Sequence, residues 1–95
     1  MEIVNLKPKK HIIVCVNERE NEDCCMNVCG MELFLYLKNY VRNNGLSGSV
    51  WITRSKCLGF CNNTGAVAVI YPEGKWITEI KEDDYDNIIK ELRLF

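Results

Sequence analysis

The first half of the chain changes from one hydrophobic period to another. Residues 11–16 form an apolar, β-branched run, which predicts a strand buried on both faces. Residues 17–23 are polar and charged, which predicts a loop. Apolar residues then recur at helical spacing and predict an amphipathic helix over about residues 28–43, ended by Asn44-Gly45. Its buried stripe comprises Leu33, Leu37, Tyr40 and Val41.

The second half reads as three strands and a closing helix. Residues 49–53, 66–71 and 75–79 have strand character, and the turn 72–74 joins the last two into a hairpin. A loop over residues 55–65 carries turn-forming residues and two cysteines. The closing helix places four apolar residues on one face, with two acids in its first turn. These residues are Asp83, Asp84, Tyr85, Ile88, Ile89 and Leu92.

The predicted order is therefore β-α-β-β-β-α. The first helix is long enough to cross between two parallel strands, and the hairpin adds antiparallel ones. This gives a mixed sheet with two helices, of α/β (α+β) class, in the thioredoxin-like layout. At 95 residues we expect one domain over 1–95, with residues 1–10 as a lead-in segment.

Composition and charge argue against several classes of function. Twelve basic and thirteen acidic residues give a net charge of −1, which argues against a nucleic-acid or anionic-membrane partner. The longest apolar run, residues 66–71, is far shorter than a membrane span. The N-terminal residues lack the apolar segment of a secretory signal, so we expect a cytoplasmic protein. In a reducing compartment, clustered cysteines favour metal or redox chemistry over structural disulfides.

The six cysteines gather around the ends of the first two strands. Since the carboxyl ends of parallel strands share one edge of a sheet, the topology predicts that the cysteine-bearing loops converge there. The first strand and the loop after it hold Cys15, Cys24, Cys25 and Cys29, and the loop after the second strand holds Cys57 and Cys61. Four thiolates, drawn from these six cysteines and brought to one end of a small domain, indicate a metal centre.

Spacing alone leaves the metal open. Structural zinc prefers paired short knuckles, and here only Cys57-x3-Cys61 fits that pattern. A two-iron cluster needs two thiolates on each iron, which two loops could deliver. A thiol–disulfide enzyme would want Cys-x-x-Cys at a helix N-terminus, and the sequence has no such pair.

The chain resembles the thioredoxin-like [2Fe–2S] ferredoxins over residues 11–94. The most specific stretch is Cys57-Leu-Gly-Phe-Cys61, followed by a valine-rich strand, Tyr-Pro-Glu-Gly and Trp76. The start, Ile-Val-Cys15-Val-Asn-Glu-Arg, is also similar. The same module recurs in a peripheral subunit of NADH dehydrogenase complexes and in hydrogenases.

The resemblance implies a cluster held by Cys15, Cys25, Cys57 and Cys61. Counting back from Leu33 selects Cys25 as the second ligand. The chain departs from the family pattern at Cys29, where Gly is usual, and at Cys24, where Ser is common, so either could replace Cys25. The resemblance also implies one-electron transfer, no catalysis of its own, redox partners of reductase or hydrogenase type, and often a homodimer.

Two other functions stay open at this point. One is a zinc-stabilised interaction module without redox work, and the other is an iron–sulfur cluster sensor or carrier, suggested by the surplus cysteines.

Several residues outside the cysteine set could also contribute. The acidic residues 18–23 could dock a basic partner, and Arg54 and Lys56 could offset thiolate charge. His11 is expected at the surface, because histidine-ligated [2Fe–2S] centres need two His. Trp51 and Trp76 are expected in the core or on a dimer surface.

Overall fold

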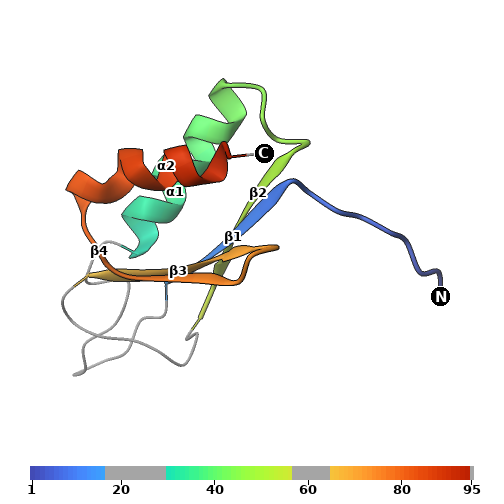
Figure 1. The fold of residues 1–95 in the computed structure, drawn as a ribbon, viewed down its shortest axis with the longest axis horizontal. Coiled ribbons are helices and arrows are strands. Elements are labelled where there is room, and N and C mark those ends of the chain that lie inside the picture. The colour runs from blue at the N-terminus through green and yellow to red at the C-terminus, as the bar shows by residue number, and fades with distance from the viewer. Residues whose placement is uncertain (17–29, 57–64, 95) are drawn as a thin grey trace.

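A computed structural model describes residues 1–16, 30–56 and 65–94. The described elements follow the order strand, helix, three strands and helix, with a short 3-10 turn before the last helix (Figure 1). Their bounds are β1 Lys10–Cys15, α1 Gly30–Asn43, β2 Val50–Ser55, β3 Ala66–Tyr71, β4 Lys75–Ile80, η1 Glu82–Asp84 and α2 Tyr85–Leu92.

The four strands form one mixed sheet in the order β2-β1-β3-β4. β1 and β2 are parallel, with Lys10 opposite Val50 and Cys15 opposite Ser55. β3 runs antiparallel to both β1 and β4, so β1 lies in the interior of the sheet. A helix joins the two parallel strands, as a parallel pair requires.

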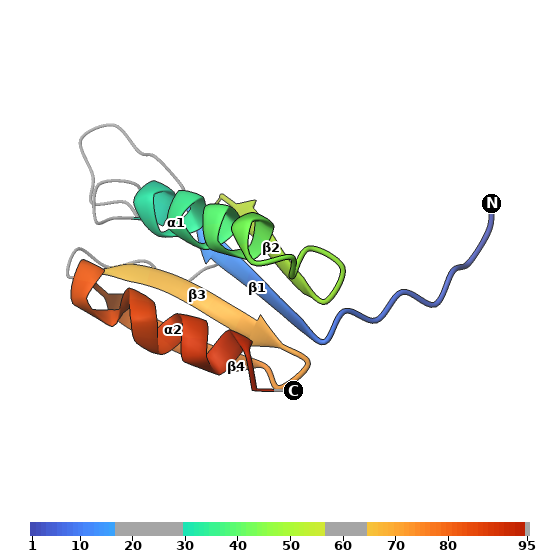
Figure 2. The same cartoon turned by 90° about the horizontal axis from the view of Figure 1, so that it is seen from above.

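Both helices lie on the same face of the sheet (Figure 2). α1 covers β1 and β2, and α2 covers β3 and β4. Leu33, Leu37 and Val41 of α1 are buried at the spacing of one helical face, and Tyr40 is partly buried beside them. The buried face of α2 comprises Tyr85, Ile88, Ile89 and Leu92. The main core therefore lies between the helices and one side of the sheet.

A polar contact also joins the two helices. The Tyr36 hydroxyl on α1 donates to Asp86 Oδ1 on α2 over 3.2 Å, and this bond raises the pKa of Tyr36 above its usual value. The rings of Tyr36 and Tyr85 lie 5.0 Å apart at a tilt of 47°, a favourable aromatic geometry. These two contacts link α1 to α2 directly.

An ion pair holds the amino end of β1. The Lys10 ammonium donates to Glu73 in the turn between β3 and β4, and Lys10 is buried. The hydrogen bond from Lys10 lowers the pKa of Glu73 below its usual 4.5. A buried lysine needs such a partner, because an unpaired charge there would be costly.

A close backbone approach lies at the start of β3. A Cβ on Gly65 would sit 2.4 Å from the carbonyl carbon and 2.6 Å from the Cα of Glu79, so only glycine fits. Glu79 has a φ of +56°, and the β3–β4 register shifts between Ala66 and Ala68. β4 thus carries a β-bulge near its end, and the backbone at Gly65, just before β3, lies directly against the bulged residue Glu79.

The predicted fold class and element order are confirmed. Five strand boundaries differ by one or two residues: β1 spans Lys10–Cys15 rather than 11–16, β2 spans Val50–Ser55 rather than 49–53, and β4 ends at Ile80 rather than residue 79. The predicted helix start near residue 28 lies outside the described residues.

The prediction that β1 is buried on both faces is wrong for Ile13, which faces away from the helices and is only half-buried. His11, expected at the surface, is half-buried on the same side. Of the two places predicted for Trp51 and Trp76, the core is excluded, since these residues are 37% and 49% exposed, while a dimer surface stays a prediction. All four residues lie on the open face of the sheet, which no described helix covers (Figure 2).

Candidate metal centre

The carboxyl ends of β1 and β2 lie side by side at one edge of the sheet. Cys15, the last residue of β1, is opposite Ser55, the last residue of β2. The Val16 amide donates to the Ser55 carbonyl over 2.9 Å and continues the pairing by one residue. The segments that follow the two strands therefore leave the sheet from the same edge, as the topology predicts.

The Cys15 side chain is buried at this edge. Its sulfur lies 3.0 Å from the backbone oxygen of Lys56, and the thiol donates the hydrogen bond. The Ser55 hydroxyl donates to the same carbonyl over 3.1 Å. The carbonyl that precedes the second cysteine segment thus receives two donors from the ends of the two strands.

The first turns of α1 lie over the same end of β2. Arg54 Nη1 is 4.0 Å from the sulfur of Met31, and its guanidinium carbon is 5.6 Å from the centre of the Phe34 ring. The amino end of α1 therefore lies near the carboxyl ends of the parallel strands. A helix N-terminus carries partial positive charge and favours nearby anions such as thiolates.

The start of β3 reaches this edge as well. Ala68 is opposite Val14 in the antiparallel β1–β3 pair, so the chain enters β3 where β1 ends. Four described chain ends consequently meet at one edge of the sheet: Val16, Gly30, Lys56 and Gly65. These ends flank residues 17–29 and 57–64, which hold the other five cysteines.

The structure describes one member of the predicted ligand set. Cys15 lies at the edge described above, whereas Cys25, Cys57 and Cys61, like the alternatives Cys24 and Cys29, lie outside the described residues. The acidic residues 18–23 lie outside them too. Within residues 1–16, 30–56 and 65–94, no three His, Cys, Asp or Glu side chains group closely enough to hold a metal ion.

The remaining predicted residues fall in two places. Arg54 and Lys56 are exposed and follow one another closely at the edge that carries Cys15. His11 lies near the opposite end of β1, half-buried, with its Nε2 2.7 Å from Thr53 Oγ1. That position keeps His11 away from the edge, so the sequence-based exclusion of a histidine ligand agrees with where the ring lies.

The donor chemistry at this edge fits a thiolate-bound metal centre. Cys15 places a cysteine sulfur at this edge, and Arg54, Lys56 and the amino end of α1 bring positive charge to the same edge, where anionic ligands would collect. Sequence analysis did not identify the Lys56 carbonyl as part of this site. A backbone atom carries no residue-type signal, and only the register of β1 against β2 places it beside Cys15.

Comparison with known proteins decides the family. A 2Fe–2S ferredoxin from Clostridium pasteurianum is 30% identical to this chain over 88 residues, which span 90% of the chain and 85% of the relative. The chain belongs to the [2Fe–2S] ferredoxins. A second 2Fe–2S ferredoxin, from Aquifex aeolicus, is 29% identical over 85 residues, or 85% of this ferredoxin and 76% of the relative.

Solved structures agree with the sequence relatives. The thioredoxin-like [2Fe–2S] ferredoxin from Aquifex aeolicus superimposes with a TM-score of 0.78 at 28% identity, covering 90% of this ferredoxin and 85% of that chain. The Cys59Ser variant of that protein matches with a TM-score of 0.75. No model of a known protein family matches the chain. The thioredoxin-like fold is therefore supported by the solved structures, and the [2Fe–2S] ferredoxin family by the sequence relatives.

None of the helices in the described part of the chain is both long and apolar enough to cross a membrane.

Proposed function

We propose that this ferredoxin carries electrons one at a time on a [2Fe–2S] cluster held by Cys15, Cys25, Cys57 and Cys61. Membership of the [2Fe–2S] ferredoxins supports the cluster. The observation that carries the ligand assignment is the position of Cys15, buried at the sheet edge where the segments with the other cysteines begin. The cluster, when bound, supplies the one-electron redox step.

The described residues would support the cluster in three ways. Cys15 must lose its proton to bind iron, so the Lys56 carbonyl would keep the Ser55 hydroxyl as its donor. Arg54 and Lys56 place positive charge at the edge, which offsets thiolate charge and raises the reduction potential. The interior position of β1 would hold Cys15 in place, because β2 pairs with Cys15 itself and β3 pairs with β1 up to Val14.

The proposed role is transport of electrons, without catalysis by this chain. Redox partners of reductase or hydrogenase type would dock near the cysteine-bearing edge, and the acidic residues 18–23, which follow β1 in the sequence, are the proposed docking segment. We place this work in the cytoplasm, since reduced cysteines persist in a reducing compartment. We also propose that residues 1–95 act as one domain.

We further propose that the ferredoxin works as a homodimer. The open face of the sheet supports this, because Trp51, His11 and Tyr71 line up across β2, β1 and β3. Trp51 and Tyr71 are 37% and 42% exposed, and Trp76 on β4 is 49% exposed. Exposed aromatic residues that gather on one face are typical of protein interfaces.

An absorption spectrum of anaerobically purified protein, with iron, sulfide and zinc assayed on the same sample, tests the proposed function. About two irons and two sulfides per chain, with visible bands that bleach on reduction, would support it. Zinc without sulfide would instead support a zinc-stabilised module and contradict electron transport. Transfer of the cluster to an apo-acceptor within minutes would favour the sensor or carrier function, for which the surplus Cys24 and Cys29 are the motivation.

A further inference from the structure

The N-terminal arm, residues 1–9, exposes apolar side chains without covering any part of its own sheet. Ile3, Val4 and Leu6 are 87%, 61% and 66% exposed. Figures 1 and 2 show the arm leaving the amino end of β1 and running away from the body of the molecule. Three exposed aliphatic side chains within four residues form an apolar surface that favours a partner.

The root of the arm is fixed in this outward direction. The Lys10 amide donates to the Ser49 carbonyl over 3.2 Å, and the Lys10 side chain is paired with Glu73. Proline fixes its own φ and disfavours the helical region for the residue before it, so Pro8 favours an extended Lys7. The first glycine of the chain is Gly30, so the arm has no glycine at which to reverse. These features disfavour a return of the arm onto its own sheet.

A groove lies beside one edge of the sheet. It has a volume of about 340 Å³ and lies between β4 and α2, with Ile77, Ile80 and Ile88 as its apolar lining. No strand in the described part of the chain pairs with the outer side of β4, so its backbone groups on that side are available. An edge strand beside an apolar groove is the arrangement into which an extended segment can add as a further strand.

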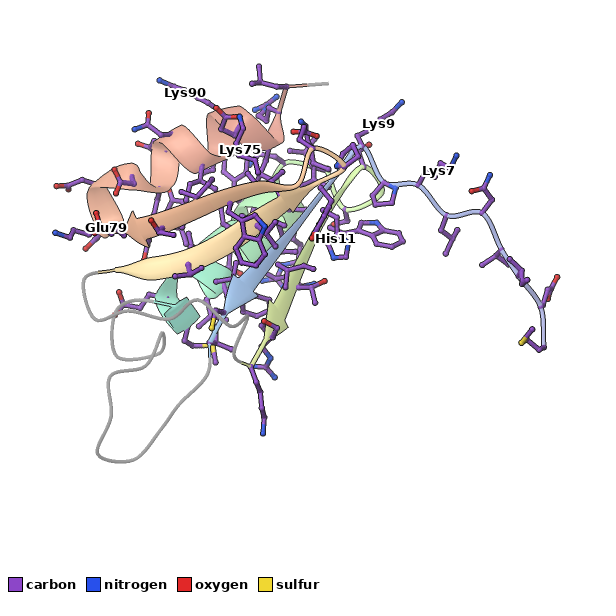
Figure 3. All side chains as sticks on the ribbon, turned by 60° about the horizontal axis from the view of Figure 1, so that its bottom comes forward. Lys7, Lys9, His11, Lys75, Glu79 and Lys90 are labelled. Carbon is purple, nitrogen blue, oxygen red and sulfur yellow. The ribbon has the colours of Figure 1, made fainter. Side chains whose placement is uncertain are left out.

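Charge distinguishes this edge from the other one. In the groove at β4, Glu91 is paired with Lys75 over 2.7 Å, and Asp84 adds a further negative charge. The smaller groove at β2 contains Lys38 and Arg42, and no acid is among its described lining residues. The arm carries Lys7 and Lys9 (Figure 3) against one acid, Glu2, so its charge complements the β4 groove and is repelled by the β2 groove.

We propose that the arm of one copy lies along the outer edge of β4 in a second copy, with Val4 and Leu6 over the groove between β4 and α2. Residues two apart in an extended chain share a face, so Val4 and Leu6 point together while Ile3 points to the opposite side. On that opposite side of β4 lies the exposed Trp76. Nine extended residues reach about 30 Å, enough to follow the ~20 Å length of β4.

This arm exchange rests on the proposed homodimer and specifies which surface would stabilise that dimer. Two equivalent copies can donate one arm each, which gives a closed, symmetric pair in which every arm and every β4 edge is used. Such an arrangement also protects the apolar edge of β4 from unspecific strand pairing.

A photo-crosslinking experiment on the holoprotein tests the exchange. Unlabelled chain with Val4→p-benzoylphenylalanine is mixed with an equal amount of unmodified ¹⁵N-labelled chain, irradiated and digested. We expect crosslinked peptides that join the unlabelled arm to labelled residues 75–91. Crosslinks confined to a single unlabelled chain would mean that the arm folds back in cis, and crosslinks to residues 50–53 would place it at β2; either result overturns the proposal.

Sedimentation of the same holoprotein separates the two levels of the proposal. A monomer contradicts both the homodimer and the arm exchange. A dimer whose crosslinks avoid residues 75–91 contradicts only the arm exchange. Neither result bears on the cluster, which the absorption spectrum reports separately.

A matched pair of variants gives a second measurement. Leu6→Asp and Asn5→Asp change the charge of the arm equally, but only the first removes an apolar side chain from the groove side. Leu6→Asp is expected to raise the dissociation constant of the dimer by about tenfold or more, and Asn5→Asp by less than about twofold. Equal effects of the two substitutions would overturn the proposed orientation.

Discussion

The Cys15 thiol donates a hydrogen bond to the backbone carbonyl of Lys56, with 3.0 Å between sulfur and oxygen. The contact joins the last residue of β1 to the residue that follows β2, just before the segment that contains Cys57 and Cys61. It requires a protonated thiol, whereas iron binds the thiolate, so metal binding must release this proton. The Lys56 carbonyl would still accept the Ser55 hydroxyl after that change.

Replacement of Cys15 is therefore predicted to reduce cluster binding while the apoprotein still folds. Cys15→Ala is expected to bring the iron content of anaerobically purified protein below half of the native value, because one iron loses a thiolate. Cys15→Ser can keep a donor to Lys56, so its apo form is expected to melt within a few degrees of native apoprotein. Native iron content and an unchanged visible spectrum in Cys15→Ala would contradict the ligand assignment.

The second ligand is predicted to be Cys25 rather than its neighbours. Serine is nearly isosteric with cysteine but a much weaker ligand for this cluster, so Cys25→Ser should lose most of the visible absorbance. Cys24→Ser and Cys29→Ser serve as matched controls and should keep it. The measurement is the absorbance per chain after anaerobic purification under identical conditions. Loss of the cluster in Cys24→Ser or Cys29→Ser instead would move the ligand to that position.

Elements governed by local periodicity could be predicted from the sequence. The stripe that includes Leu33 and Leu37 predicted α1, and the tight turn 72–74 between two strand-like runs predicted the β3–β4 hairpin. The position of Cys15 at the edge shared by β1 and β2 followed from the geometry of a strand–helix–strand unit. Each of these rests on neighbouring residues or on a general rule of handedness and pairing.

Features that depend on tertiary approach could not be predicted in this way. The pairing of Lys10 with Glu73 joins residues far apart in the chain, and neither residue type indicates it. The exposure of Trp51 and Trp76 depends on which face of the sheet the helices cover. An apolar strand is predicted to be buried on both faces, and nothing in the sequence indicated that Ile13 would be only half-buried.

The close approach at Gly65 predicts a large cost for one added methyl group. In Gly65→Ala the new Cβ would lie within 2.7 Å of three backbone atoms of Glu79 and Ile80, which cannot move aside as a flexible side chain would. We expect the free energy of unfolding to fall by about 1–3 kcal/mol. Urea denaturation monitored by tryptophan fluorescence gives this quantity.

A second glycine provides the control for this substitution. A Cβ on Gly48 would meet nothing within 4 Å, so Gly48→Ala should change the free energy of unfolding by no more than about 0.5 kcal/mol. Equal stability of the two variants would show that the chain before β3 can shift away from the bulge in β4. That result would contradict a requirement for glycine at position 65.

The ion pair between Lys10 and Glu73 predicts a specific acid sensitivity. Because the hydrogen bond from Lys10 lowers the pKa of Glu73 in the folded state, the unfolded chain binds the proton more readily. The pair therefore stabilises the fold fully above pH 4.5, and its contribution is lost as the pH falls through the lowered folded pKa. In Glu73→Gln the melting temperature of the apoprotein should fall less steeply between about pH 5 and pH 3 than in the native chain.

Glu82→Gln, which changes an exposed carboxylate in η1, is the control and should follow the native profile. Native-like steepness in Glu73→Gln would mean that Lys10 does not depend on Glu73, and that another group compensates its charge at the amino end of β1.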